Sequence, residues 1–330
     1  MKKGVTFLLL IILSCMACGN SKSGVQEGKA ECVMEINSRR VLYESNGDTR
    51  LPMASTTKIV TAITILEISE NLAKEVIIPK EAEGVEGSSV YLKAGEKYTI
   101  EELLYGLMLR SGNDCATALA LHTQGTLEAF AAKMNEIAQG AGALCSSFQN
   151  PHGLPAKEHY TTARDLSAIS CYAMQNPTFR KIVATKYYQP RNWKNKNKML
   201  QKYEGGIGIK TGYTKEAGRC LVAAAERNGM TLVCTLLNCP TTYERTSELL
   251  DDAFSAYHMT KLLACGDKFP VNDGIAITRE EFYYPLLQGE EEAIEYLVVP
   301  TKNNIDKEII GHLEIRLAKR LLFSTNLYKL

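Results

Sequence analysis

The chain has 330 residues, a hydrophobic fraction of 45% and a formal net charge of +1, from 38 basic and 37 acidic side chains. This length predicts roughly two domains, and the hydrophobic fraction is that of a globular protein with a buried core. The balanced charge excludes an acidic disordered chain and a strongly basic nucleic-acid-binding protein, so we expect no nucleic-acid partner. Glycine and proline are too scarce for a collagen-like or low-complexity chain.

A short apolar run opens the chain. Lys2 and Lys3 precede apolar residues over 5–13, and small residues follow. A charged start, a short apolar stretch and small residues are typical of a secretory signal peptide. The run is too short to span a bilayer, which takes about 20 apolar residues. We therefore predict a signal peptide over 1–18, a flexible tether over 19–29, and an extracytoplasmic location in the bacterial cell envelope.

Two leader cysteines are candidates for lipidation. Cys18, which follows Met16-Ala17, resembles the acylated cysteine of bacterial lipoproteins, and Cys15 after Leu13-Ser14 is the other candidate. Acylation of either would attach the protein to the membrane, whereas ordinary cleavage would release it, and both remain open. The eight later cysteines are scattered through apolar segments, so we expect core thiols. Beyond the leader, no cysteine and histidine cluster has zinc-binding spacing, and we expect no metal or other cofactor.

Hydrophobic periodicity predicts strands at both ends of a first domain and helices between them. In chain order we expect a β-hairpin over 31–36 and 40–44, helices over 55–70, 100–109, 114–123, 127–139 and 162–175, strands over 218–226 and 230–237, and a helix over 245–258. Asn228-Gly229 is a strong hairpin signal between the two later strands. The pattern predicts an α+β domain over 30–265, with helices on an antiparallel sheet and an additional helical lobe.

The pattern of apolar and polar residues changes after Cys265. Residues 269–278, 296–300 and 311–327 read as short strands, because apolar and polar side chains alternate along them. We therefore predict a small all-β domain over 266–330.

One segment has a strong charge bias. Residues 180–202 carry eight basic side chains and no acidic one. A solvated loop or hairpin is the first interpretation of such a run. A surface that faces an anionic polymer is the alternative.

The first motif that carries chemistry is Ser55-Thr56-Thr57-Lys58, at the start of a predicted helix. Ser55 and Lys58 are one helical turn apart and therefore point to the same side. A serine hydroxyl needs an adjacent base to become a nucleophile, and a lysine can be that base if burial or a second cation lowers its pKa. A serine cap followed by an exposed lysine is the non-catalytic alternative.

Two further motifs follow. Ser111-Gly112-Asn113 lies between two predicted helices, where a simple turn would also explain it. Lys210-Thr211-Gly212 ends an apolar stretch. On an edge strand beside the nucleophile, Lys210 would supply positive charge and Thr211 a hydroxyl for an anionic group. Gly212 would let the backbone approach a ligand, although a strand that ends in a glycine turn is the alternative.

In this order, the three motifs resemble the set of the penicillin-binding proteins and class A β-lactamases. Over residues 32–257 the chain resembles, more specifically, the low-molecular-mass D-alanyl-D-alanine carboxypeptidases of peptidase family S11. The segments that carry the resemblance are RLPMA (50–54), SGND (111–114), NPHGLP (150–155), HYTTARD (159–165), GIKTGYT (208–214) and AGRCLV (217–222). The resemblance implies a penicillin-binding-protein or β-lactamase-like transpeptidase fold, followed here by the small all-β domain.

The resemblance implies a role for each matched residue of the first two motifs. Ser55 would be the acylated nucleophile, Lys58 its base, and Ser111 a proton relay. Asn113 would hydrogen-bond the substrate amide. We expect a structural role for Asp114, as a helix cap.

The resemblance also implies a binding region for the terminal carboxylate of the substrate, formed by Lys210 and Thr211 beside Gly212. The N–H groups of Ser55 and Tyr213 would form the oxyanion hole. Arg245 falls near the position of an arginine that steers the carboxylate in the family.

The implied activity is removal of the terminal D-alanine from peptidoglycan pentapeptide stems, with β-lactam antibiotics as covalent inhibitors. The first alternative is a β-lactamase, but class A enzymes add a deacylating glutamate, and no E-x-x-L-N pattern occurs between residues 150 and 175. The second alternative is a non-catalytic sensor with a penicillin-binding fold. Family members often end in an amphipathic anchoring helix, whereas 311–330 alternates like a strand, which argues against that route and gives the leader cysteines more weight as a possible anchor.

Overall fold

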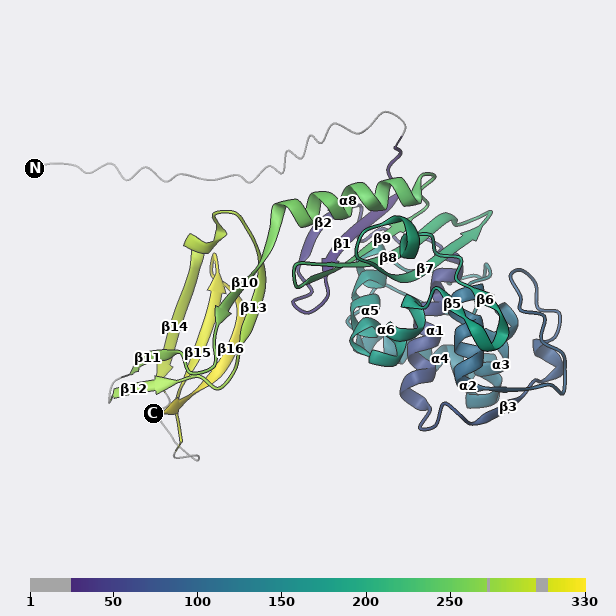
Figure 1. Cartoon of the computed structure of the whole chain (residues 1–330), viewed down its shortest axis with the longest axis horizontal. Helices are drawn as coiled ribbons and strands as arrows, with labels where there is room; N and C mark the ends of the chain where they lie inside the picture. Colours follow the sequence, from purple (N-terminus) through teal and green to yellow (C-terminus); the bar gives the residue numbers. More distant parts are fainter. Residues whose placement is uncertain (1–24, 272–273, 301–307) are drawn as a thin grey trace, which may run out of the picture.

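The computed structural model describes residues 25–271, 274–300 and 308–330. The predicted leader, with Cys15 and Cys18, and the first part of the tether lie outside the described residues. Figure 1 shows a larger lobe with a sheet and most of the helices, and a smaller lobe of strands. The two are joined where α8 (Thr242–Ala256) continues directly into β10 (Tyr257–Leu263).

A five-stranded antiparallel sheet forms the centre of the larger lobe. Its spatial order is β2-β1-β9-β8-β7, so β7 is an edge strand. The hairpin turn at Asn228-Gly229 has positive φ at both residues, as the predicted tight turn requires. The strands are β1 (Ala30–Glu35), β2 (Val41–Ser45), β7 (Gly206–Thr214), β8 (Gly218–Arg227) and β9 (Met230–Leu237).

Helices cover both faces of this sheet. On one face, α5 packs against β1 and β9, with α1 and α6 beside it, and the helical lobe extends this main core. On the other face, α8 packs against β8 and β9 over a second apolar cluster. The remaining helices are α1 (Lys58–Ile68), α2 (Ile100–Tyr105), α3 (Asn113–Gln124), α4 (Leu127–Gly140), α5 (Ala163–Gln175), α6 (Pro177–Ala184) and α7 (Met199–Lys202).

Local sequence explains several of these boundaries. Thr99 and Glu102 form a capping box at the start of α2, and the Thr162 side chain accepts a hydrogen bond from the first turn of α5. Short single-turn helices and two small hairpins complete the lobe. They are η1 (Ala54–Thr57), η2 (Lys80–Ala82), η3 (Gly106–Arg110), η4 (Gln189–Arg191), β3 (Glu75–Ile77) with β4 (Lys97–Thr99), and β5 (Tyr187–Tyr188) with β6 (Trp193–Lys194).

The smaller lobe has its own apolar core beneath two sheets. One sheet has the order β11-β12-β16-β15-β14, and β10 pairs with β13 in the other. Arg40, on the β1–β2 hairpin, forms an ion pair of 2.6 Å with Glu290 and so connects the lobes. The elements are β11 (Lys268–Val271), β12 (Gly274–Ile277), β13 (Phe282–Leu287), η5 (Glu290–Ala293), β14 (Ile294–Pro300), β15 (Ile309–Leu317) and β16 (Arg320–Lys329).

The α+β class and the β-rich C-terminal region are confirmed, but some boundaries differ from the prediction. The predicted helix over 245–258 ends at Ala256, because the residues from Tyr257 onward pair with β13. The β-rich lobe therefore begins with β10 and not at residue 266. The predicted strand over 311–327 is a hairpin of β15 and β16, which turns at Ala318 and Lys319 with positive φ.

Candidate active site

The first motif of the sequence forms a turn that leads into a buried helix. Ser55 lies in the single-turn helix η1, and Lys58 is the first residue of α1. The Lys58 side chain is completely buried. Its Nζ donates to Ser55 Oγ at 3.1 Å, to Asn113 Oδ1 at 2.6 Å and to the His152 carbonyl at 2.6 Å. The structure therefore brings the predicted serine, lysine and asparagine together around one amine.

Two buried lysines with lowered pKa values face this region. Burial, and then the charge of Lys210, holds the pKa of Lys58 well below its usual range. Burial, and then the charge of Lys196, lowers the pKa of Lys210 to about 7. Lys210 lies on the edge strand β7, as predicted, and its Nζ donates to the Thr211 carbonyl at 3.0 Å. The expected second cation that lowers the pKa of Lys58 is therefore present.

The second motif forms a sharp turn between η3 and α3. Ser111 is buried and adopts a left-handed conformation with φ of 65°. Asn113 opens α3, and its Nδ2 donates to the Glu86 carbonyl at 2.5 Å. Such a conformation is costly for a residue other than glycine and persists only where the surroundings fix it. Here it turns the chain so that Asn113 faces Lys58.

Asp114 has a structural role, but it is not the expected helix cap, because Gly112 occupies the N-cap position of α3. The Asp114 carboxylate accepts hydrogen bonds from Ser89 Oγ at 2.5 Å and from the backbone N–H groups of Val90 at 3.0 Å and Leu92 at 3.1 Å. These bonds fix the loop before β4 against the start of α3. The loop also supplies the carbonyl of Glu86 that holds Asn113.

Gly212 is required by a close contact between two backbone segments. A Cβ at this position would lie 3.0 Å from the Met53 carbonyl and 3.1 Å from the backbone nitrogens of Ser55 and Thr56. Real Cβ atoms are rarely this close to backbone atoms, so a side chain would displace the turn. Gly212 therefore lets β7 cross the start of η1, which brings the neighbouring Tyr213 close to Ser55.

A second glycine supports the same turn from the other side. Gly153 has φ of 88°, and a Cβ there would lie 2.0 Å from the Ala54 carbonyl. Ala54 itself has φ of 50°, which is unusual for a residue with a side chain. The turn that carries Ser55 is thus held between β7 and the loop over 150–155.

Two histidines hold the site, and sequence reasoning did not assign these contacts. The His152 carbonyl accepts a hydrogen bond from Lys58, while burial and then Lys58 lower the pKa of its ring to about 3. His159 Nδ1 accepts from the Gln149 N–H at 2.9 Å, so its Nε2 carries the proton toward Thr57 Oγ1, also at 2.9 Å. Burial lowers the pKa of His159 to about 4. Both rings are therefore neutral near pH 7. The NPHGLP and HYTTARD segments contained these residues, but their partners depend on tertiary packing.

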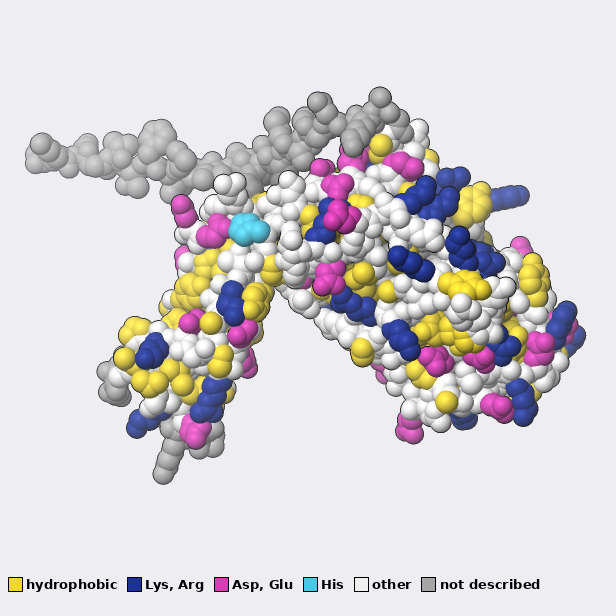
Figure 2. Space-filling view, viewed as in Figure 1, with side chains coloured by type: hydrophobic (Ala, Val, Ile, Leu, Met, Phe, Trp, Pro, Cys, Tyr) yellow, Lys and Arg dark blue, Asp and Glu magenta, His cyan; other side chains and the backbone are white. Residues whose placement is uncertain are grey.

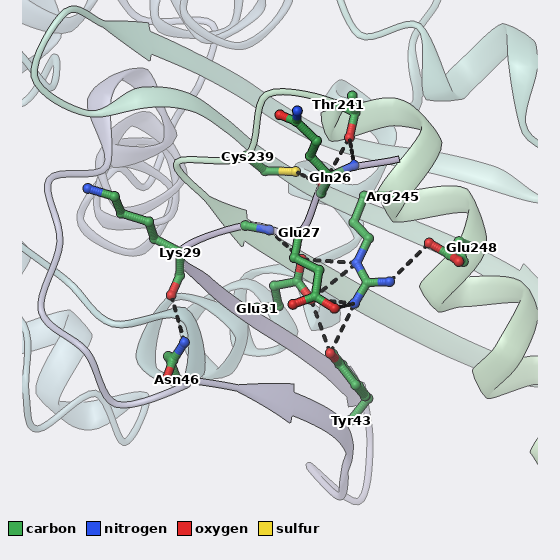
Figure 3. Close-up of polar contacts among 11 residues, drawn as sticks. Gln26, Glu27, Lys29, Glu31, Tyr43, Asn46, Cys239, Thr241, Arg245 and Glu248 are labelled. Carbon is green, nitrogen blue, oxygen red and sulfur yellow. Dashed lines mark hydrogen bonds and ion pairs between the residues drawn. The ribbon is translucent and has the colours of Figure 1, made fainter. Parts of the chain in front are cut away.

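Arg245 does not join this cluster, which corrects the expectation that it binds substrate. Its guanidinium donates to the fully buried Glu31 carboxylate at 2.8 Å, to Glu248 at 2.9 Å and to Tyr43 Oη at 3.0 Å. Figure 3 shows this network between α8 and the first strands. Arg245 thus lies on the sheet face that α8 covers, whereas α1, which carries Lys58, packs on the opposite face. The match to the family position was a coincidence of sequence spacing.

The cysteines are free thiols within the described part of the chain, and most are buried as expected. Cys265 is exposed and Cys145 is half-buried, while the buried ones are Cys32, Cys115, Cys171, Cys220, Cys234 and Cys239. Burial raises the pKa of the Cys220 thiol to about 11. We therefore assign no chemistry to the buried thiols.

A serine and a buried lysine at a helix start, an S-G-N turn beside them and a K-T-G edge strand are typical of the penicillin-recognising acyl-transfer proteins. The family model described as D-alanyl-D-alanine carboxypeptidase matches residues 20–241. The chain belongs to this family, peptidase family S11. The resemblance inferred from the motifs is thereby confirmed.

Known relatives and solved structures agree with this assignment. The chain is 34% identical over 245 residues to the D-alanyl-D-alanine carboxypeptidase DacF of Bacillus subtilis, and the match covers 70% of this chain and 63% of DacF. It is 38% identical over 227 residues to the D-alanyl-D-alanine carboxypeptidase of Streptomyces sp. strain K15, which covers 62% of this chain and 78% of that protein. Penicillin binding protein 5 from Haemophilus influenzae matches with a TM-score of 0.78 over 94% of this chain and 98% of its own, at 24% identity, which shows the fold.

Proposed function

We propose that this protein is a serine-type carboxypeptidase that removes the terminal D-alanine from peptidoglycan pentapeptide stems. The observation that carries the proposal is the completely buried Lys58 amine, 3.1 Å from Ser55 Oγ and with a lowered pKa. A lysine in this state can accept a proton near neutral pH, which an exposed lysine cannot. The choice of a D-alanine-terminated peptide as the substrate rests on the family assignment.

The hydrogen-bond partners of Lys58 fit a general base. A neutral amine has two N–H donors and one lone pair. If the two donors point to Asn113 Oδ1 and the His152 carbonyl, both at 2.6 Å, the lone pair faces Ser55 Oγ. The Ser55 hydroxyl then gives its proton to Lys58 as its oxygen attacks the carbonyl of the penultimate D-alanine. Lys58, with Ser111 as a relay, returns the proton to the leaving amine.

The backbone around Ser55 fits an oxyanion hole. The contact at Gly212 brings the β7 backbone beside the start of η1. The N–H groups of Ser55 and Tyr213 would then donate to the oxygen that becomes negative during attack. Lys210 and Thr211 would hold the terminal carboxylate of the substrate. The second N–H of Asn113 Nδ2, beyond the one used by Glu86, is available for the substrate amide.

The structure favours a carboxypeptidase over a β-lactamase. A β-lactamase of class A requires a glutamate that activates the deacylating water. Within residues 150–175, Glu158 is the single glutamate, and it is exposed in a turn with φ of 62°. It has no contact with the buried Lys58 among the hydrogen bonds of the described chain. A long-lived acyl-enzyme with β-lactams follows from this.

We also propose that the protein acts in the cell envelope, attached through lipid on Cys18 or Cys15, both outside the described residues. Among the residues that the structure describes, no helix is long and apolar enough to cross a membrane. Acyl chains contribute about 0.8 kcal/mol per buried CH₂ group, so their loss is easily detected. A Cys15→Ser/Cys18→Ser protein should move from the membrane fraction to the soluble fraction. An unchanged distribution would rule out this anchor.

The direct test of the activity is release of free D-alanine from a short peptide that ends in D-Ala-D-Ala. The wild-type protein should release it, and a Ser55→Ala protein with unchanged thermal stability should not. Rapid hydrolysis of penicillin without release of D-alanine would instead assign the protein as a β-lactamase. Binding of the peptide without turnover would favour the sensor.

A further inference from the structure

The basic segment of the sequence is built so that its lysines share one side. Asn195 and Asn197 are buried, while Lys194, Lys196 and Lys198 are exposed. The Asn195 amide donates to the Val183 and Thr185 carbonyls at 3.3 and 3.0 Å, which fixes the segment against the end of α6. The three lysines alternate with the two buried asparagines and therefore lie on the same exposed side of the segment, where Lys196 Nζ also donates to Ser88 Oγ at 3.4 Å.

These lysines line an open cavity of about 320 Å³. Its walls carry five cations, two buried asparagines and one glutamine, and no acidic side chain. Figure 2 shows several Lys and Arg side chains on the larger lobe over β7 and the segment before it. The five cations are Arg110, Lys194, Lys196, Lys198 and Lys202.

Four of the five cavity cations belong to the basic run, and three of the other four basic residues of that run are paired with carboxylates. Arg180 pairs with Glu226, Lys181 with Glu101 at 3.7 Å, and Arg191 with Glu102 at 2.8 Å. In the described part of the chain, none of the five cavity cations has a carboxylate within ion-pair distance. Within the described run, the basic residues without a carboxylate partner are Lys186, which lies outside the cavity, and the four lysines that line it.

A buried amide in the cavity wall also lacks a partner. Asn197 is 3% exposed, and its Oδ1 accepts from the Met199 N–H at 3.0 Å. Its Nδ2 is buried without a hydrogen-bond partner in the structure. Buried donors are normally paired, so an unpaired one beside uncompensated cations indicates a missing acceptor. The wall thus offers ammonium, guanidinium and amide donors to an anion.

We propose that this cavity binds a linear polymer of phosphodiesters. Five uncompensated cations call for several anionic groups, which a single small carboxylate does not supply. Four of the five are lysines, and lysine binds phosphate as a point charge, whereas planar carboxylates are matched best by paired arginine N–H groups. Lys194 and Lys196 are two residues apart, about 6.5 Å along extended backbone, so these cations are repeated along a line, as the anionic groups of a linear polymer are.

The polymer would lie beside the active site. Arg110 directly precedes Ser111, and the Lys196 N–H donates to the Leu109 carbonyl at 3.1 Å. A bound phosphodiester chain would therefore hold the enzyme on the envelope polymer with its catalytic side facing the wall. This binding does not depend on the chemistry of Ser55, so it can be tested separately from the proposed function.

The test is binding of fluorescently labelled poly(glycerol phosphate) to the full chain, measured by anisotropy. The wild-type protein should bind, and its affinity should fall roughly 50-fold between 50 and 200 mM salt, as expected for about four neutralised phosphates on a flexible polyanion. A Lys194→Gln/Lys198→Gln/Lys202→Gln protein should bind at least tenfold more weakly and with a smaller salt dependence. The matched control, Lys93→Gln/Lys97→Gln/Lys133→Gln, loses equal charge from lysines that have carboxylate partners, and it should bind like the wild type.

Three outcomes would overturn the proposal. The first is that the wild-type protein does not bind the polymer, and the second is that both triple variants lose affinity equally. The third is that poly-glutamate binds as tightly as poly(glycerol phosphate), which would show that the site does not select phosphodiesters. Release of D-alanine from a short peptide without polymer should be unchanged in the first triple variant. A loss there would instead assign the cavity to the peptide substrate. A Ser55→Ala protein should bind the polymer like the wild type. The binding result can therefore be interpreted even if the protein proves not to be a carboxypeptidase.

Discussion

The side-chain nitrogen of Lys58 lies 3.1 Å from the hydroxyl oxygen of Ser55, inside the protein, and none of its hydrogen-bond partners among the described residues is acidic. Removing a charged amine from water is costly unless it is paired, so burial favours the neutral form. The charge of Lys210 acts in the same direction. The pair is therefore arranged as the proposed function requires, with the serine hydroxyl next to an amine that can accept a proton near neutral pH.

The first prediction concerns this pair. Ser55→Ala should abolish acylation, and Lys58→Ala should lower kcat/KM by about two to four orders of magnitude, because a positioned base contributes that much and the two residues act as a unit. Rates of D-alanine release and thermal unfolding should be measured for both. Lys133→Ala, which changes a half-buried lysine of α4 that pairs with Glu136, is the control. Normal turnover by the Lys58→Ala protein would remove Lys58 from the mechanism.

The second prediction concerns pH. Activity requires neutral Lys58, so kcat/KM should rise with pH through a pKa well below that of ordinary lysine. In the proposed function, cationic Lys210 attracts the substrate carboxylate, and burial lowers the pKa of Lys210 to about 7, so KM should increase above that pH. The kcat/KM profile should thus be bell-shaped. Lys210→Arg should move the falling limb to higher pH, since arginine stays charged. A flat profile between pH 6 and 10 would contradict both assignments.

The third prediction concerns the crossing of β7 and η1. Gly212→Ala places a methyl group 3.0 to 3.1 Å from backbone atoms of the Ser55 turn, so it should displace the nucleophile and the oxyanion hole. We expect at least a tenfold loss of kcat/KM with only a modest loss of thermal stability. Gly140→Ala in α4 has open space and should leave activity unchanged. Equal activity of the two variants would show that the contact does not position Ser55.

The fourth prediction separates Arg245 from substrate binding. Arg245→Ala leaves the Glu31 carboxylate buried and without its main partner, so it should lower the free energy of unfolding by about 3 to 5 kcal/mol. The KM for a D-Ala-D-Ala peptide should not change at temperatures where the variant is folded. A large rise in KM without destabilisation would return Arg245 to the active site.

The sequence was informative where chemistry depends on short spacing. The three-residue separation of Ser55 and Lys58 predicted their contact, and the K-T-G motif predicted an edge strand. The contact between Lys58 and Asn113 spans 55 residues of sequence, and it was not predicted, although the resemblance placed both residues in one site. For Arg245 the sequence was misleading. Its distance from the K-T-G motif along the chain does not determine which face of the sheet its helix covers.

Other features could not be read from residue patterns because tertiary contacts decide them. Tyr257 and the residues after it look like the end of an amphipathic helix, yet pairing with β13 makes them a strand. The positive φ of Ala54 has no local sequence signal, because glycine would be expected there. It exists because Gly153 and Gly212 hold the backbone of the turn from two sides.

The measurement that tests the central claim most directly is the intact mass of the protein after mixing with penicillin, followed by peptide mapping. The β-lactam ring would open on Ser55, and its amine stays tethered, which blocks the approach of water. We predict an increase by one drug mass, located on the peptide that contains Ser55 and absent from the Ser55→Ala protein. Rapid hydrolysis of the drug with no adduct, or an adduct on another residue, would contradict Ser55 as the nucleophile of a penicillin-sensitive carboxypeptidase.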